Sequence, residues 1–148
     1  MKTVYVSLSG TNLSSGFIPK EMSLYFPDDQ SWRHYFFNTP PGRQLTENDI
    51  HTDWYTRRVL GGIGLHDALP GSLHYNQHRD LLRMLGMEYQ IICSGRVTYD
   101  HIVKLLPYAD VINSPLVYPK ELPPASCGIK HRARFCSLAK LWHLVEHS

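Results

Sequence analysis

Two of the three cysteines in this chain lie near its C-terminal end, with a histidine between them. They form the pattern Cys127-x3-His131-x4-Cys136. Thiolate sulfur and imidazole nitrogen are preferred zinc ligands, and such short spacings let neighbouring side chains reach one tetrahedral ion. A structural zinc site needs a fourth ligand, for which His143, about two turns further on, is one candidate. The alternative is that Cys136 is a small buried side chain at a helix start.

Composition limits the class of protein. The chain has 148 residues, 43% of them hydrophobic, which predicts a single globular domain over residues 1–148. An odd number of cysteines and no apolar segment of export or membrane-spanning length favour an intracellular, reducing compartment, cytoplasmic or nuclear, and no membrane partner. A formal net charge of +2 is too small to indicate nucleic-acid binding by itself.

The chain divides into an N-terminal strand region and a mixed remainder. Alternating β-branched and aromatic residues predict three strands, at 3–9, 21–26 and 32–37, which form an antiparallel meander. Gly10–Asn12 and Ser14–Gly16 carry turn residues. Thr46 and Thr98 are expected to cap helices over 46–60 and 98–106. The remaining expected elements are a helix over 77–85, strands over 88–94 and 110–113, and a final helix from 137 that buries Leu138, Leu141, Trp142 and Val145.

This order of elements is that of an RNase H-like α/β domain. The segments 16–26 and 61–67, together with Cys127…His131…Cys136, resemble the Maelstrom domain and its arthropod and viral relatives. The resemblance implies a DEDDh 3′–5′ exonuclease lineage, with a mixed sheet whose three N-terminal antiparallel strands are flanked by helices. It also implies one structural Zn²⁺ bound by Glu21, Cys127, His131 and Cys136 in that chain order. Without the resemblance, the residues favour equally the alternative that Glu21 is a solvated strand residue.

The acids that a DEDDh enzyme needs are absent from two expected positions. Its first strand should carry Asp-x-Glu, whereas Val6-Ser7-Leu8-Ser9 has no acid. Its last helix should carry a final acid near the position of Lys140. Hydroxyls and an ammonium group cannot hold two Mg²⁺ ions. The sequence therefore predicts a degenerate catalytic centre, and no residue is assigned a catalytic role.

Other histidines invite weaker interpretations. His66-Asp67 lies among glycines and is read as a structural turn rather than a tuned catalytic pair. His74 and His78 have helical i, i+4 spacing, which suits either a metal pair or, as we favour, a polar helix face.

Basic residues gather in two places that suit RNA phosphates. Candidate contacts are Arg57, Arg58, Lys130, Arg132 and Arg134, with exposed aromatics such as Trp32, Tyr35 or Tyr55 for base stacking. The alternative is that these charges only solvate a loop and that the aromatics are core. The resemblance implies binding or weak cleavage of single-stranded RNA and partners in small-RNA (piRNA) silencing. Three functions stay open: a degenerate RNA-binding module, a metal-independent single-stranded RNA endonuclease, and a pure protein-interaction adaptor.

Overall fold

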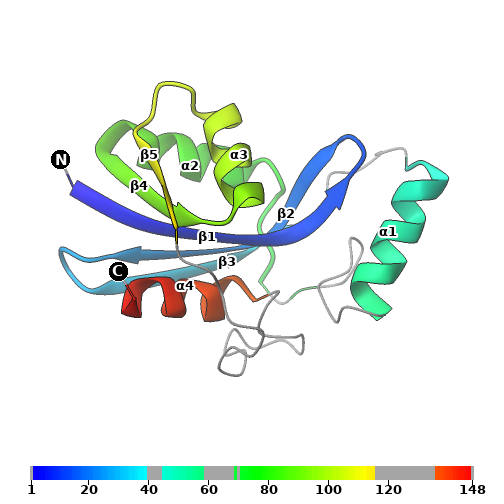
Figure 1. Ribbon diagram of the computed structural model, residues 1–148, viewed down its shortest axis with the longest axis horizontal. Coiled ribbons are helices and arrows are strands. Elements are labelled where there is room, and N and C mark those ends of the chain that lie inside the picture. The colour runs from blue at the N-terminus through cyan, green and yellow to red at the C-terminus, as the bar shows by residue number, and fades with distance from the viewer. Residues whose placement is uncertain (1, 40–44, 59–68, 70, 116–135, 148) are drawn as a thin grey trace.

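The computed structural model describes residues 2–39, 45–58, 69, 71–115 and 136–147. Its centre is a five-stranded mixed sheet with the strand order β3-β2-β1-β4-β5, which confirms the predicted α/β class. Helices α2 and α3 cover one face of the sheet and α4 the other, while α1 lies beyond the far end of the β1–β2 hairpin (Figure 1). On the face opposite α2 and α3, α4 packs against β1 and β2.

The first three strands form an antiparallel meander: β1 (Lys2–Leu13), β2 (Gly16–Phe26) and β3 (Ser31–Phe36). The prediction of a turn at Gly10–Asn12 was wrong, because β1 continues through a bulge between Ser9 and Gly10. A Cβ on Gly10 would lie 2.0 Å from the Ile18 carbonyl oxygen, so glycine is required for the two strands to pair there. Because the hairpin is longer than predicted, β2 begins at Gly16, before its predicted start at Glu21.

Two further strands, β4 (Tyr89–Ser94) and β5 (Val111–Ser114), extend the sheet in parallel from β1. The helices α2 (Gln77–Glu88) and α3 (Arg96–Leu105) precede and follow β4, so each covers the same face. Apolar side chains of that face make the main core, among them Val4, Val6, Leu8, Met22, Leu24, Leu82, Ile91, Ile102 and Leu106. This core is built by the alternation of β1 and β2, whose other residues therefore face α4.

The face beneath α4 (Ser137–Glu146) is polar at its centre. Register pairs Ser7 with Ser23 and Ser9 with Glu21, and all four side chains are buried. The predicted apolar stripe of α4 was wrong at Trp142, which is 49% exposed. Leu141 and Leu144 make the buried stripe together with Ser137 and Ala139, because the sheet surface that α4 meets carries small hydroxyl side chains.

Helix starts show one correct and one wrong prediction. Helix α1 (Glu47–Arg58) has the predicted Thr46 cap: Thr46 Oγ1 accepts from the Asp49 N–H at 3.1 Å and Asp49 Oδ2 from the Thr46 N–H at 3.2 Å. Thr98, in contrast, is buried within the first turn of α3, and the N-cap is Gly95 with φ of 100°. Only the start of α1 is determined by hydrogen bonds between residues three apart in sequence.

Candidate functional site

Glu21 and Cys136, two of the four predicted zinc ligands, meet on the α4 face of the sheet. They are 115 residues apart in sequence, and the Cys136 sulfur lies 4.0 Å from Glu21 Oε2. Both side chains are fully buried, since β2 supplies Glu21 from its centre and Cys136 is the N-cap of α4. Cys127 and His131 lie outside the described residues, so the complete ligand set stays a prediction.

The separation of these two atoms fits two ligands of one zinc ion. Tetrahedral bonds of about 2.3 Å to sulfur and about 2.0–2.2 Å to oxygen place the two ligand atoms roughly 3.5–3.7 Å apart. The observed 4.0 Å needs a shift of a few tenths of an ångström to reach that value. A buried carboxylate beside a buried thiol is also a donor set that a cation would stabilise. Glu21 and Cys136 therefore fit a zinc site.

The carboxylate of Glu21 is held by groups that the sequence analysis did not identify. Glu21 Oε1 accepts a hydrogen bond from the Ser137 backbone N–H at the start of α4. His34 on β3 places Nε2 at 2.7 Å from Oε2, and Ser23 and Ser137 share a buried hydroxyl contact of 2.7 Å. His34 is too close to Oε2 to share a metal with it, and acts by orienting the carboxylate. The alternation of β3 is the signal that would have found it, because residues 32, 34 and 36 share one face.

Ser7, Ser9 and Lys140, the residues expected in place of catalytic acids, belong to the same face. Ser7 and Ser9 are buried on β1, and Lys140 Nζ donates to the backbone oxygen of Leu8 between them at 2.7 Å. Burial lowers the pKa of Lys140 to about 8, although Glu21 and Cys136 act against the shift. Among the described residues no three His, Cys, Asp or Glu side chains gather to hold a metal ion.

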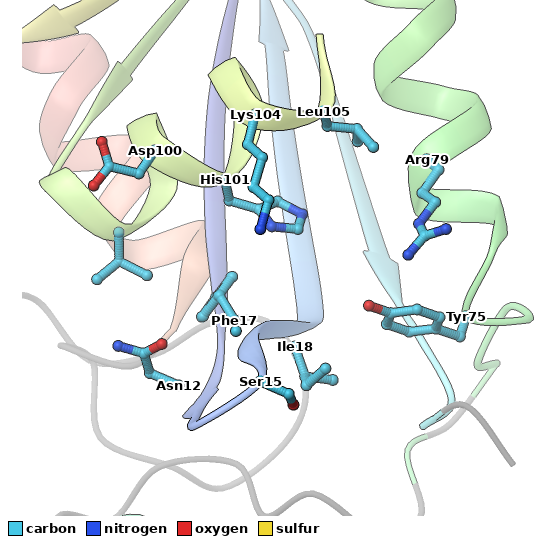
Figure 2. A pocket seen from close by; sticks show the side chains of 12 residues that line it. Asn12, Ser15, Phe17, Ile18, Tyr75, Arg79, Asp100, His101, Lys104 and Leu105 are labelled. Carbon is cyan, nitrogen blue, oxygen red and sulfur yellow. The ribbon is translucent and has the colours of Figure 1, made fainter. Parts of the chain in front are cut away.

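A pocket of about 520 Å³ lies between the β1–β2 hairpin and α3. Figure 2 shows Phe17 and Ile18 from β2, His101 and Lys104 from α3, and Tyr75 and Arg79 around its walls. The Arg79 guanidinium lies 5.9 Å from the centroid of the Tyr75 ring. Aromatic surfaces with a few cationic and polar groups are typical of a small-molecule pocket.

His101, on the wall of this pocket, forms a stacked pair with His78. Their Nε2 atoms are 3.4 Å apart, and His78 Nδ1 donates to the Tyr75 carbonyl oxygen at 2.6 Å. Burial lowers the pKa of both rings, that of His101 to about 4. The predicted polar face of His74 and His78 was therefore wrong, because His74 precedes α2 and His78 is fully buried.

The third cysteine and the competing histidine occupy different surroundings. Cys93 is buried on β4 in the main core, where burial raises the pKa of its thiol to about 12. His143, the competing fourth zinc ligand, packs against His147 with ring centroids 4.2 Å apart.

The described part of the predicted RNA surface is on α1. Arg57 and Arg58 are exposed at its end, close in sequence to exposed Trp54 and Tyr55. Trp32 is also exposed and stacks on Trp142 of α4 with centroids 5.1 Å apart. Tyr35, in contrast, is partly buried against the main core. Lys130, Arg132 and Arg134, like the 61–67 segment with His66-Asp67, lie outside the described residues.

Comparisons with known proteins found no match to the chain among family models, curated proteins or solved structures. Within the described ranges, no helix is long and apolar enough to cross a membrane.

Proposed function

We propose that this chain is a zinc-stabilised, catalytically degenerate RNase H-like module that binds single-stranded RNA, with proteins of small-RNA silencing as further partners. The observation that carries the proposal is the approach of Glu21 to Cys136 at 4.0 Å under α4. A zinc ion bound there would link β2 to the start of the last helix. Its chemistry is structural: a closed set of four protein ligands joins segments that are distant in sequence.

Two further features support the RNase H-like part of the proposal. The elements follow the order that the sequence analysis associated with such a domain, three strands and then helices alternating with β4 and β5. The β1 positions expected to bear acids carry Ser7 and Ser9, and Lys140 approaches the same strand from α4. Serine hydroxyls and an ammonium group do not hold Mg²⁺. The proposed module therefore has the RNase H-like fold without Mg²⁺-dependent hydrolysis.

Support for RNA binding comes from exposed aromatic and basic side chains. Trp54, Tyr55, Arg57 and Arg58 occur on one exposed helix. Base stacking on aromatic side chains and neutralisation of phosphates by arginine are the two terms that drive sequence-tolerant binding of single strands.

The zinc proposal is tested by a matched pair of cysteine variants. Cys136→Ala and Cys93→Ala each remove one fully buried thiol, so both lose roughly 1–2 kcal/mol of packing. Only Cys136→Ala should also lose the metal and its contribution to folding, and should melt at a clearly lower temperature than Cys93→Ala. Elemental analysis of wild-type protein purified without added metal should find one zinc per chain. Equal zinc contents in the two variants would contradict the ligand assignment.

The RNA proposal is tested by the salt dependence of binding to a fluorescent single-stranded oligonucleotide. Arg57→Ala/Arg58→Ala and Arg132→Ala/Arg134→Ala should each weaken binding and flatten the salt slope by about 0.7 per lost phosphate contact. Arg83→Ala, at an exposed position of α2, is the control. Absence of binding at low salt would favour the protein-adaptor alternative. Cleavage that persists in EDTA would favour the metal-independent endonuclease.

A further inference from the structure

A cavity of about 250 Å³ lies where the bulge of β1, the β4–α3 turn and α4 meet. Its polar wall combines hydroxyls, glycine backbone and two basic side chains: Ser9, Gly10, Ser94, Arg96, Thr98 and Lys140. None of the described residues that line it is acidic. Such a lining suits an anion with several oxygen atoms, because hydroxyls and ammonium groups can all donate to it.

The N-terminus of α3 opens into this cavity. Gly95, Val97 and the other two residues of the first turn all line it. Gly95 adopts φ of 100°, which favours glycine, and provides no side-chain cap, so it leaves the helix start open. The first N–H groups of a helix have no partner within it, and the helix dipole makes this end positive. A phosphate is the common ligand of such a helix start.

A second observation, independent of the helix, points to a missing ligand. Ser9 is 4% exposed, and its hydroxyl has no hydrogen-bond partner in the described part of the chain. Buried polar groups in folded proteins are almost always paired, so an unpaired one calls for an explanation. Lys140, which also lines the cavity, uses one donor on the Leu8 oxygen, and an ammonium group has three. One phosphate group would accept from both side chains.

The pocket shown in Figure 2 adjoins this cavity, because Phe17 and Val97 line both. Its walls offer the Phe17 and Tyr75 rings for stacking, and Arg79 and Lys104 as donors. At about 520 Å³ it falls within the size range of pockets for small molecules. The carboxylate of Asp100 also lies on its wall, and it pairs with Arg96 at 3.5 Å.

We propose that the cavity at the start of α3 binds the phosphate group of a nucleotide directly, without metal ions, while the adjoining pocket holds the nucleoside. Ser9, Lys140 and the first-turn N–H groups of α3 are the phosphate-binding groups. The inference deepens the proposed function and rests on it for the identity of the polymer as RNA. A phosphomonoester at a strand end and a free mononucleotide share this chemistry, and the test distinguishes them.

The test uses Ser9→Ala, which removes a hydroxyl that has no partner in the described chain and should leave the fold intact. Lys140→Met is the second variant, checked for zinc content and melting temperature, and Arg83→Met is an exposed control. The probes are inorganic phosphate, AMP, adenosine, and single-stranded RNA with a 5′-phosphate, a 3′-phosphate or hydroxyl ends. Binding is measured by calorimetry at constant ionic strength.

Phosphate and AMP should bind wild-type protein and Arg83→Met, and adenosine should bind more weakly. If the ligand is the phosphate at a strand end, one of the two phosphorylated oligonucleotides should bind more tightly than RNA with hydroxyl ends. If the ligand is a free nucleotide, AMP should bind and the phosphorylation of the strand end should have no effect. Ser9→Ala and Lys140→Met should each weaken phosphate binding by about tenfold, the scale of a hydrogen bond to a charged group. Equal binding of these ligands by Ser9→Ala and wild type overturns the inference, even where RNA binding itself persists. RNA that fails to bind while AMP binds leaves the inference standing and removes the RNA proposal.

Discussion

The stacked pair of His78 and His101 should make the protein lose stability in mild acid. A carbonyl oxygen only accepts, so His78 Nδ1 carries the hydrogen donated to Tyr75, and its Nε2 carries the lone pair. That lone pair faces His101 Nε2 at 3.4 Å, which assigns the hydrogen there to His101. Both rings are then neutral in the folded protein. A proton added to His78 Nε2 would point at a second donor, and a proton on His101 would charge a half-buried ring.

The magnitude follows from the two pKa values of His101. Burial, and then the neighbouring His78, lower its pKa from 6.5 to about 4 in the folded protein. Between these values the unfolded chain binds the proton and the folded chain does not, so stability falls as pH decreases from 6.5 towards 4. His101 alone should remove on the order of 2 kcal/mol at pH 5 and about 3 kcal/mol at pH 4. The lowered pKa of His78 adds to the loss in the same direction. Against a total stability of about 5–15 kcal/mol, this change is easily measured.

The assay is urea unfolding of wild type and His101→Phe at pH 7.5, 6 and 5. The phenylalanine keeps an aromatic ring beside Phe17, whose centroid is 5.5 Å from that of His101. We expect His101→Phe to be less stable at pH 7.5 but to lose about 2 kcal/mol less than wild type on going to pH 5. The difference between the proteins is the decisive quantity, because the proposed zinc ligands titrate in both. Exposed His51→Gln should behave as wild type. Parallel losses for wild type and His101→Phe would show that His101 is not held neutral by the fold.

The remaining predictions concern helix α1 and the residues Ser7, Ser9 and Lys140. Hydrogen bonds from the Ser14 backbone and hydroxyl, among others, hold the pKa of Asp49 at about 2, so this carboxylate stabilises the fold above pH 4 and its contribution is lost as pH falls towards 2. Asp49→Ala should therefore lower the melting temperature by a few degrees at pH 7 and lose less on acidification from pH 4 to 2, as followed by circular dichroism. In the proposed RNase H-like lineage, Ser7, Ser9 and Lys140 occupy positions where acids are needed, so we expect no Mg²⁺-dependent 3′–5′ digestion of single-stranded RNA. Digestion that follows the protein through repeated purification and requires Mg²⁺ would refute this.

The sequence by itself determined the local elements of this protein. Alternation of apolar and polar residues identified β2 and β3, and periodic leucines identified α2, because these patterns reflect hydrogen bonding and burial within a few residues. The Thr46–Asp49 capping box was predicted for the same reason, since its two reciprocal bonds span three residues. The bulge at Gly10 escaped prediction: glycine is typical of turns, and only the pairing partner, with its Ile18 oxygen, distinguishes a bulge from a turn.

The tertiary structure alone decided which side chains meet and which face outward. Trp142 is a large apolar residue of the kind found in cores, yet it is exposed. The sheet surface beneath α4 carries small serines, and a different stripe of the helix packs against it. The spacing of His78 predicted a polar helix face, yet its side chain is fully buried and forms a neutral pair with His101. The approach of Glu21 to Cys136 was expected from a resemblance. The hydrogen bond from the Ser137 N–H to Glu21, and the cavity that Ser9 of β1 shares with the start of α3, depend instead on how the three layers pack. Residue spacing carries no record of such distant contacts, because they arise only when the faces of separate elements are buried against one another.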